Sequence, residues 1–259
     1  MQVLSRVMNT ITGLVLLGTA IGSHASQLNW VSPAGSVAFG SSVAVLPNGN
    51  IVVTDPCDPS GGAAYLYSPN RTLISKVVGV SPGFSSCSAN PGTIEIHVLK
   101  NGNYLLAYPR RPNGSMLEVG MVAWASGTTG LSGVISDANA LLGSKAEDRI
   151  GSDGITLLAN GNYVIRSSQW DNGSFNGAGA ATWGNGNSGV SGRISASNSL
   201  VGTSSGAQIG SEVTALSNGN YVVNAFGWRN ALGDMVGATT WVNGATGITG
   251  TISEANSLV

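Results

Sequence analysis

Residues 155–165 read I-T-L-L-A-N-G-N-Y-V-I, two apolar runs joined by the tripeptide Asn-Gly-Asn. Asparagine and glycine both accept positive φ, and an Asn-Gly step between β-branched runs is typical of a β-hairpin. The tripeptide recurs in matching context from Asn48, Asn101 and Asn218, so successive copies are 53, 59 and 58 residues apart. The pattern predicts four equivalent hairpins, over residues 41–54, 94–107, 153–166 and 211–224.

The rest of the unit repeats as well. A tryptophan follows 23 residues after the first Asn of the later three tripeptides, at Trp124, Trp183 and Trp241. Tyr65-Leu66-Tyr67 stands in its place in the divergent first copy, where Leu73 to Val80 supplies a fourth strand. In the later copies a fourth apolar segment (L-S-G-V-I-S, V-S-G-R-I-S, I-T-G-T-I-S) is predicted to be that strand. A short helical turn is expected next, capped by serine and stopped by glycine. The expected caps are Ser136, Ser195 and Ser253, and the stops are Gly143 and Gly202.

Four such units occupy about residues 36–80, 88–143, 150–202 and 209–259. Repeats of about 58 residues with four antiparallel strands are typical of propeller blades, which bury both faces by stacking. The predicted fold is therefore all-β and propeller-like, in one domain over residues 26–259. An open β-repeat array or a sandwich is the alternative.

The first unit, S-V-A-V-L-P-N-G-N-I-V-V-T-D-P followed by A-Y-L-Y-S-P-N-R-T-L-I-S, resembles the NHL-type propeller repeat. The later three units resemble a tandem repeat of unknown function found in bacterial secreted and cell-surface proteins. The resemblance covers about residues 36–259. It implies a propeller-like β architecture and brings no catalytic residues with it.

Composition excludes some classes of function. Charged residues make up 9% of the chain, against roughly 25% in an average globular protein. The formal net charge is −1 and there is no basic run, so the cationic footprint of a nucleic-acid-binding protein is missing.

The first 25 residues read as a secretory signal peptide. Arg6 precedes an apolar stretch from Ile11 to Gly22, and Ser23-His24-Ala25 offers small residues for cleavage. No later segment is long enough to span a membrane. We therefore expect a secreted, periplasmic or cell-surface protein. Its two cysteines, Cys57 and Cys87, are expected to pair, because propeller topology puts both on one face in an oxidising compartment.

Few residues offer chemistry. The sequence has no G-x-S-x-G in the context of a nucleophile elbow, no zinc motif and no phosphate-binding glycine loop. His97 is the only histidine after the signal peptide, and it stands near Glu95. Aligning the inner strands brings Glu95, His97 and Glu212 toward the expected propeller axis, where they could ligate a divalent metal ion. The alternative is a solvated channel lined by small polar groups.

Two further tryptophans, Trp170 and Trp228, fall in the loops between the second and third strands. They are the candidate ligand contacts, whereas the repeated Trp183 and Trp241 are interpreted as packing residues between blades.

These observations predict a non-catalytic repeat module without a cofactor that binds a glycan or another envelope protein. One alternative is a propeller enzyme with an axial metal site of the lactonase kind. Another is a structural segment of a larger surface assembly. The chain ends at Asn256-Ser257-Leu258-Val259, where earlier copies continue with Gly, so we expect an array that is truncated or closes on another chain.

Overall fold

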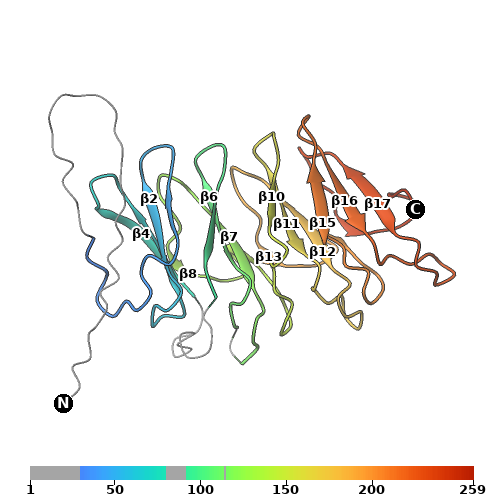
Figure 1. The fold of residues 1–259 in the computed structure, drawn as a ribbon, viewed down its shortest axis with the longest axis horizontal. Helices are drawn as coiled ribbons and strands as arrows, with labels where there is room; N and C mark the ends of the chain where they lie inside the picture. Colours follow the sequence, from blue (N-terminus) through green and yellow to red (C-terminus); the bar gives the residue numbers. More distant parts are fainter. Residues whose placement is uncertain (1–29, 80–91, 114) are drawn as a thin grey trace, which may run out of the picture.

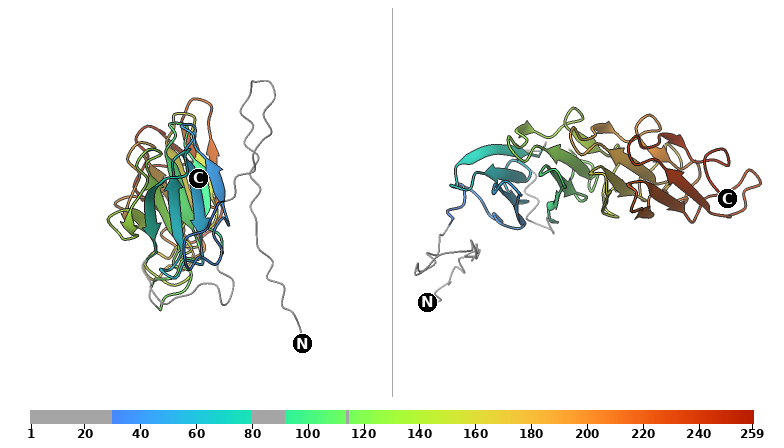
Figure 2. Two further views of the ribbon diagram at one scale, coloured as in Figure 1. Left: turned by 90° about the vertical axis from the view of Figure 1, so that its left-hand side faces the viewer. Right: turned by 90° about the horizontal axis from the view of Figure 1, so that it is seen from above.

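A computed structural model describes residues 30–79, 92–113 and 115–259; the predicted signal peptide lies outside them. All regular elements in these ranges are β-strands, grouped into four sheets. The sheets stand one behind another along the longest axis of the molecule (Figure 1), as the view from above also shows (Figure 2). The prediction of an all-β chain of four repeats is confirmed. No helix among the described residues is long and apolar enough to cross a membrane.

The first sheet has the order β1-β2-β3-β4-β8 and the second has the order β13-β9-β7-β6-β5. The third has the order β10-β11-β12-β14-β18, and the fourth consists of β15-β16-β17. The strand bounds in chain order are β1 Val43–Val45, β2 Ile51–Asp55, β3 Ala63–Tyr67, β4 Leu73–Val78, β5 Glu95–Val98, β6 Tyr104–Tyr108, β7 Met121–Ala125, β8 Gly133–Val134, β9 Ala140–Leu142, β10 Ile155–Leu157, β11 Tyr163–Ser167, β12 Ala180–Gly184, β13 Gly192–Arg193, β14 Leu200–Val201, β15 Glu212–Ala215, β16 Tyr221–Ala225, β17 Ala238–Val242 and β18 Gly250–Thr251.

The four predicted hairpins are confirmed. Each Asn-Gly-Asn lies between two antiparallel strands, which form the pairs β1–β2, β5–β6, β10–β11 and β15–β16. The central glycine has positive φ in every copy, from +85° to +91°. The first Asn also accepts a hydrogen bond from the backbone N–H two residues on, as Asn160 does from Asn162 at 3.1 Å. This side-chain hydrogen bond stabilises the turn, and the glycine supplies the positive φ that the turn needs.

The fourth strand of the later repeats differs from the prediction. The segment expected to supply it forms β8, β13 or β18, which pairs in parallel with the outermost strand of the preceding sheet. Gly133, Gly192 and Gly250 begin these strands with φ from +86° to +106°, a conformation that redirects the chain.

The chain then folds back through the expected serine turn, but no helix forms there. Ser195 N–H donates to Asn198 Oδ1 at 3.0 Å, and Asn198 Nδ2 donates to the carbonyl of Arg193 at 2.9 Å. The residues after the turn return to their own sheet as β9 and β14. Each later repeat therefore lends one strand to the repeat before it.

The sheets do not close a ring. The first and fourth sheets lie at opposite ends of the row (Figure 1), which is the open array of the alternative prediction. Trp30 packs edge-on against Tyr67 with ring centroids 4.8 Å apart, and Phe39 against Tyr65 at 5.4 Å. These rings cap the outer face of the first sheet, so that face is not available to the fourth.

The core is divided among the gaps between neighbouring sheets. Leu66 of the first sheet and Leu106 of the second belong to one buried cluster. Leu105 and Ile165 share the next cluster, and Val164 and Val223 share the last. Because every cluster is built from two repeats, a single repeat could not bury its own apolar faces.

Candidate functional site

One backbone carbonyl links each pair of later repeats. The carbonyl of Gly244 in the fourth repeat accepts from Asn162 Nδ2 and from Trp183 Nε1 in the third, both at 2.9 Å. Gly186 receives the equivalent bonds from the second repeat, including 2.9 Å from Trp124 Nε1. The Trp124 ring also covers Gly189, where an added Cβ would lie 2.5 Å from the tryptophan Cβ. Trp124 and Trp183 are thus packing residues between repeats.

Trp241, predicted to pack in the same way, does not: it is 58% exposed on the outer face of the fourth sheet. Strand register places Trp241 beside Val222 and Val222 beside Thr214. A second row lies two positions away along each strand, on the same face, and consists of Thr239, Asn224 and Glu212. We call these six side chains the terminal face.

The second row of the terminal face is a hydrogen-bonded polar network. Asn224 Nδ2 donates to Glu212 Oε2 at 2.9 Å, and Thr239 Oγ1 donates to Asn224 Oδ1 at 3.1 Å. The second repeat has apolar residues where Thr239 and Asn224 stand, namely Val122 and Ala107, both buried beneath the third repeat. The terminal face is therefore chemically suited to water or to a polar ligand.

The prediction that Trp170 and Trp228 contact a ligand is wrong. They are only 4% and 5% exposed and belong to the apolar clusters between sheets. Their loops fold back onto the sheets, and the backbone N–H of Trp170 donates to the carbonyl of Ser167 at 3.2 Å. Burial removes the rings from any ligand, and the accessible tryptophan is Trp241.

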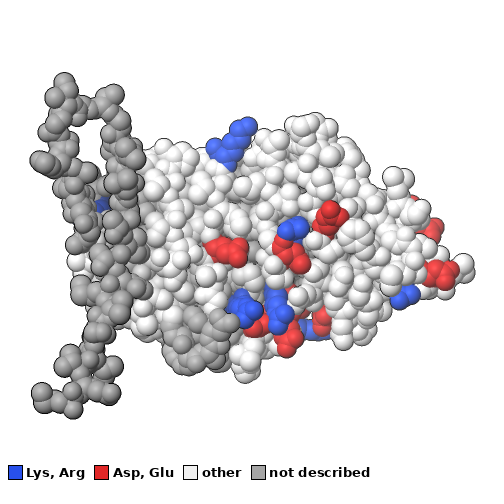
Figure 3. Space-filling view, viewed as in Figure 1, with Lys and Arg blue, Asp and Glu red and all other residues white. Residues whose placement is uncertain are grey.

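A second candidate site lies between the second and third repeats. Charged side chains gather near the middle of one face of the molecule, while much of the remaining surface on that side is uncharged (Figure 3). A pocket of about 290 Å³ opens among charged and polar residues of these repeats. We call it the junction pocket; its lining residues are Gly92, Thr93, Glu95, Pro109, Arg110, Arg149, Ser152 and Gln169.

Arg149 is held firmly in the wall of the junction pocket. Its Nε and Nη2 atoms each lie 2.5 Å from Glu118 Oε2, and its Nη1 donates to Gln169 Oε1 at 3.1 Å. Arg110 is freer, because its nearest carboxylate oxygen, Glu118 Oε1, is 3.9 Å away. About half of the Arg110 side chain is exposed. One arginine is thus neutralised by its neighbours and the other remains available.

The fold does not require these charges. The same backbone hydrogen bond forms where the second repeat meets the third and where the third meets the fourth. Arg149 N–H donates to the carbonyl of Glu118 at 3.0 Å at the first junction, and Gln208 N–H donates to the carbonyl of Gly177 at 3.1 Å at the second. At the second of these junctions, Gly177 takes the place of Glu118 with φ +58°. Glu118 adopts φ +52°, which is unfavourable for a residue with a side chain. A carboxylate therefore stands where glycine would be easier to accommodate.

The predicted metal ligands are only partly brought together. His97 Nε2 lies 3.3 Å from Glu95 Oε2, without hydrogen-bond geometry. Glu212 is on the fourth sheet, bonded to Asn224, while the other two are on the second. An open row has no common axis onto which these strands could converge. Among the described residues, no cluster of three or more His, Cys, Asp or Glu side chains could hold a metal ion.

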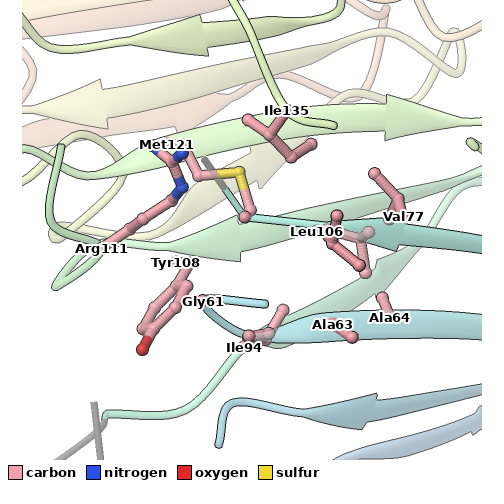
Figure 4. Close-up of a pocket in the computed structure, with 13 residues that line it drawn as sticks. Gly61, Ala63, Ala64, Val77, Ile94, Leu106, Tyr108, Arg111, Met121 and Ile135 are labelled. Atoms are coloured by element: carbon pink, nitrogen blue, oxygen red, sulfur yellow. The ribbon is translucent and has the colours of Figure 1, made fainter. Parts of the chain in front are cut away.

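A buried cation lies between the first and second repeats. Arg111 is 1% exposed, and none of its guanidinium nitrogens has a hydrogen-bond partner. It lines a cavity of about 10 Å³ beside Tyr108 and Met121 (Figure 4). Burial lowers the pKa of Arg111 to about 10, so the group is still charged at neutral pH. Trp170 and Trp228 occupy the equivalent position of the next repeats, so an apolar side chain suits this site.

The predicted disulfide involves one described residue. Cys57 is 6% exposed and disulfide-bonded. Cys87 lies outside the described residues, so its pairing with Cys57 stays a prediction.

Three segments of the chain, residues 98–152, 157–211 and 215–259, match the family described as "Repeat of unknown function (DUF5650)". The matched segments lie in the later three repeats, so the NHL resemblance of the first unit stays a prediction. Similar solved structures include a crystal structure of a protein of unknown function from Bacteroides caccae. It aligns over 89% of this chain and 70% of that one, with 16% identity and a TM-score of 0.34. No curated protein matches.

Proposed function

Since the chain belongs to the DUF5650 family of repeats, whose function is unknown, we propose from its geometry that it is an exported, non-catalytic binding module whose terminal face holds a glycan. The observation that carries the proposal is the exposure of Trp241, because its counterparts Trp124 and Trp183 are covered by the next repeat. The signal-peptide pattern of residues 1–25 and the low charge favour a place at the bacterial surface.

The terminal face suits a sugar in two respects. The C–H groups of a sugar ring can pack on the flat indole of Trp241, which combines apolar area with one N–H donor. The neighbouring row of Glu212, Asn224 and Thr239 offers carboxylate, amide and hydroxyl groups to the sugar hydroxyls. Adjacent strands are about 4.8 Å apart, so this row spans more than one hydroxyl of an extended ligand.

The experiment is a glycan-array screen of the exported protein, followed by titration of any glycan that binds. Trp241→Ala should abolish binding, while the midpoint of thermal unfolding stays close to that of the unchanged protein because the ring is largely exposed. Phe175→Ala is the matched control, since Phe175 is 41% exposed on a loop of the third repeat. Failure of the intact protein to bind any glycan, or equal binding by Trp241→Ala, would count against the proposal.

A second candidate function is a segment of a larger assembly, in which the terminal face receives another repeat. The equivalent faces of the preceding repeats support it, since Gly247 packs under Trp183 as Gly189 does under Trp124. Analytical ultracentrifugation separates the two functions. Self-association of the intact chain that Trp241→Ala removes would favour assembly, whereas a monomer that binds glycan would favour the first function.

A further inference from the structure

We infer that the junction pocket is a second binding site, which takes a small ligand carrying a carboxylate together with a hydrogen-bond donor. The site is independent of the terminal face. It is formed by the second and third repeats, and Trp241 belongs to the fourth.

The carboxylate would bind Arg110. Among the described residues Arg110 donates no hydrogen bond, and its one ion-pair partner, Glu118 at 3.9 Å, is already bonded to Arg149. A guanidinium presents paired N–H donors that match the two oxygens of a carboxylate. The guanidinium of Arg149 lies in the same wall but is already bonded to Glu118, which leaves Arg110 as the arginine that can bind the ligand.

The donor would face Glu95. This carboxylate lines the same pocket, its side chain is 49% exposed, and no hydrogen bond to it is found in the part of the chain that the structure describes. Its ionic neighbour, His97 Nε2, lies at 3.3 Å. Arg110 and Glu95 are thus a cation and an anion in one pocket, each without a hydrogen bond to another described residue, an arrangement complementary to a ligand with the opposite pair. The hydroxyls of Thr93 and Ser152 complete a polar lining.

The size and the construction of the pocket agree with this ligand. A volume of about 290 Å³ is close to the lower end of small-molecule sites. Glu118, which orients Arg149, replaces the glycine of the next junction at a conformational cost. Such strain is retained where it positions a group.

Two sources share this chemistry, a peptide carboxyl terminus and an acidic sugar. The test therefore titrates the exported protein with the dipeptide Ala-Ala, with glucuronate and with glucose, by isothermal calorimetry or by NMR. We expect glucuronate or the dipeptide to bind, glucose not to bind, and binding to weaken as salt is raised.

Two variants assign the contacts. Arg110→Gln should weaken binding by about tenfold or more, the loss typical of a charged hydrogen bond. Lys100→Gln is the charge-matched control outside the pocket and should have no effect. Glu95→Gln should weaken binding of the dipeptide, whose ammonium it would contact, more than binding of glucuronate. Thermal unfolding midpoints verify that each variant is folded.

The inference is overturned if neither carboxylate ligand binds, if glucose binds as well as glucuronate, or if Arg110→Gln behaves like Lys100→Gln. The terminal face is tested separately, because Trp241→Ala should leave these titrations unchanged and Arg110→Gln should leave binding of an uncharged glycan unchanged.

Discussion

Asn162 and Gly244 are 82 residues apart in the chain and 2.9 Å apart in space, joined by a hydrogen bond from the Asn162 amide to the Gly244 carbonyl. The other end of the same side chain, Oδ1, accepts from Gly186 N–H at 3.0 Å. Asn103 does the same one repeat earlier, with Gly186 and Gly127 as its partners. The last residue of Asn-Gly-Asn therefore fastens its own repeat and the following one.

Replacing Asn162 by Ala should lower the free energy of unfolding by about 1–3 kcal/mol, because two partly buried hydrogen bonds are lost. Asn220→Ala is the matched control. Asn220 accepts from Gly244 N–H at 3.0 Å within its own repeat, and its side-chain amide donates no hydrogen bond to another repeat among the described residues. Chemical denaturation should show a smaller loss for Asn220→Ala, and equal losses would contradict a role between repeats.

Gly186→Ala should be more damaging than Gly161→Ala. A Cβ on Gly186 would lie 2.1 Å from the carbonyl oxygen of Gly161, so the backbone would have to move. A Cβ on Gly161 would meet nothing within 4 Å, and only its φ of +91° opposes a side chain. We expect a loss of about 1 kcal/mol for Gly161→Ala and clearly more for Gly186→Ala. Thermal unfolding of the two variants measures the difference; the reverse order would be inconsistent with the close approach.

Asp58 should stabilise the first repeat in a pH-dependent way. Burial opposes its ionisation, but hydrogen bonds from Tyr65 Oη at 2.7 Å and Lys76 Nζ at 2.9 Å prevail and lower its pKa from 3.8 to about 2. Because the folded pKa is below the unfolded one, this stabilisation is present above about pH 4 and is lost as the pH falls toward 2.

Asp58→Asn should therefore lower the unfolding free energy at neutral pH by about 1–3 kcal/mol, a range reduced because Lys76 is partly exposed. The difference between variant and unchanged protein should shrink as the pH falls from about 4 to about 2. Melting curves across this range test the claim, and a difference that is constant with pH would show that the ionised carboxylate is not responsible.

Arg111→Met should stabilise the protein by about 1–4 kcal/mol, since it keeps the aliphatic stem and removes a buried charge without a partner. Arg110→Met, a change to the exposed neighbour, should have little effect on stability. Denaturant titration would detect the gain. A loss of stability in Arg111→Met would instead mean that the guanidinium is paired in solution.

Local signals were sufficient for much of the fold. The Asn-Gly-Asn tripeptides predicted the hairpins correctly, because turn geometry depends on the φ preferences of adjacent residues and hardly on the rest of the chain. The repeat interval likewise predicted the number of units and the place of the Trp strands. The interpretation of the repeated Trp183 and Trp241 as packing residues is correct for Trp183 and wrong for Trp241, which is exposed.

The candidate sites could not be predicted in this way. The junction pocket combines Glu95, Arg110 and Arg149, which lie far apart in the chain, and no motif links them. Trp170 and Trp228 lie in loops that follow a strand, and such a position predicts an accessible ring. Whether a tryptophan in a loop is buried depends on how the loop folds back onto the sheet.

The sequence by itself determined the local structure of this protein: an all-β chain, its four hairpins and the repeated tryptophan, because each depends on residues close together in the chain. Only the tertiary structure decided how the repeats are joined and which side chains remain accessible. Whether a strand pairs with its own sheet or with the one before, and whether four sheets close a ring or stand in a row, depends on contacts between distant residues. Trp183 and Trp241 carry the same local signal, and one is covered and the other exposed only because of what packs against them.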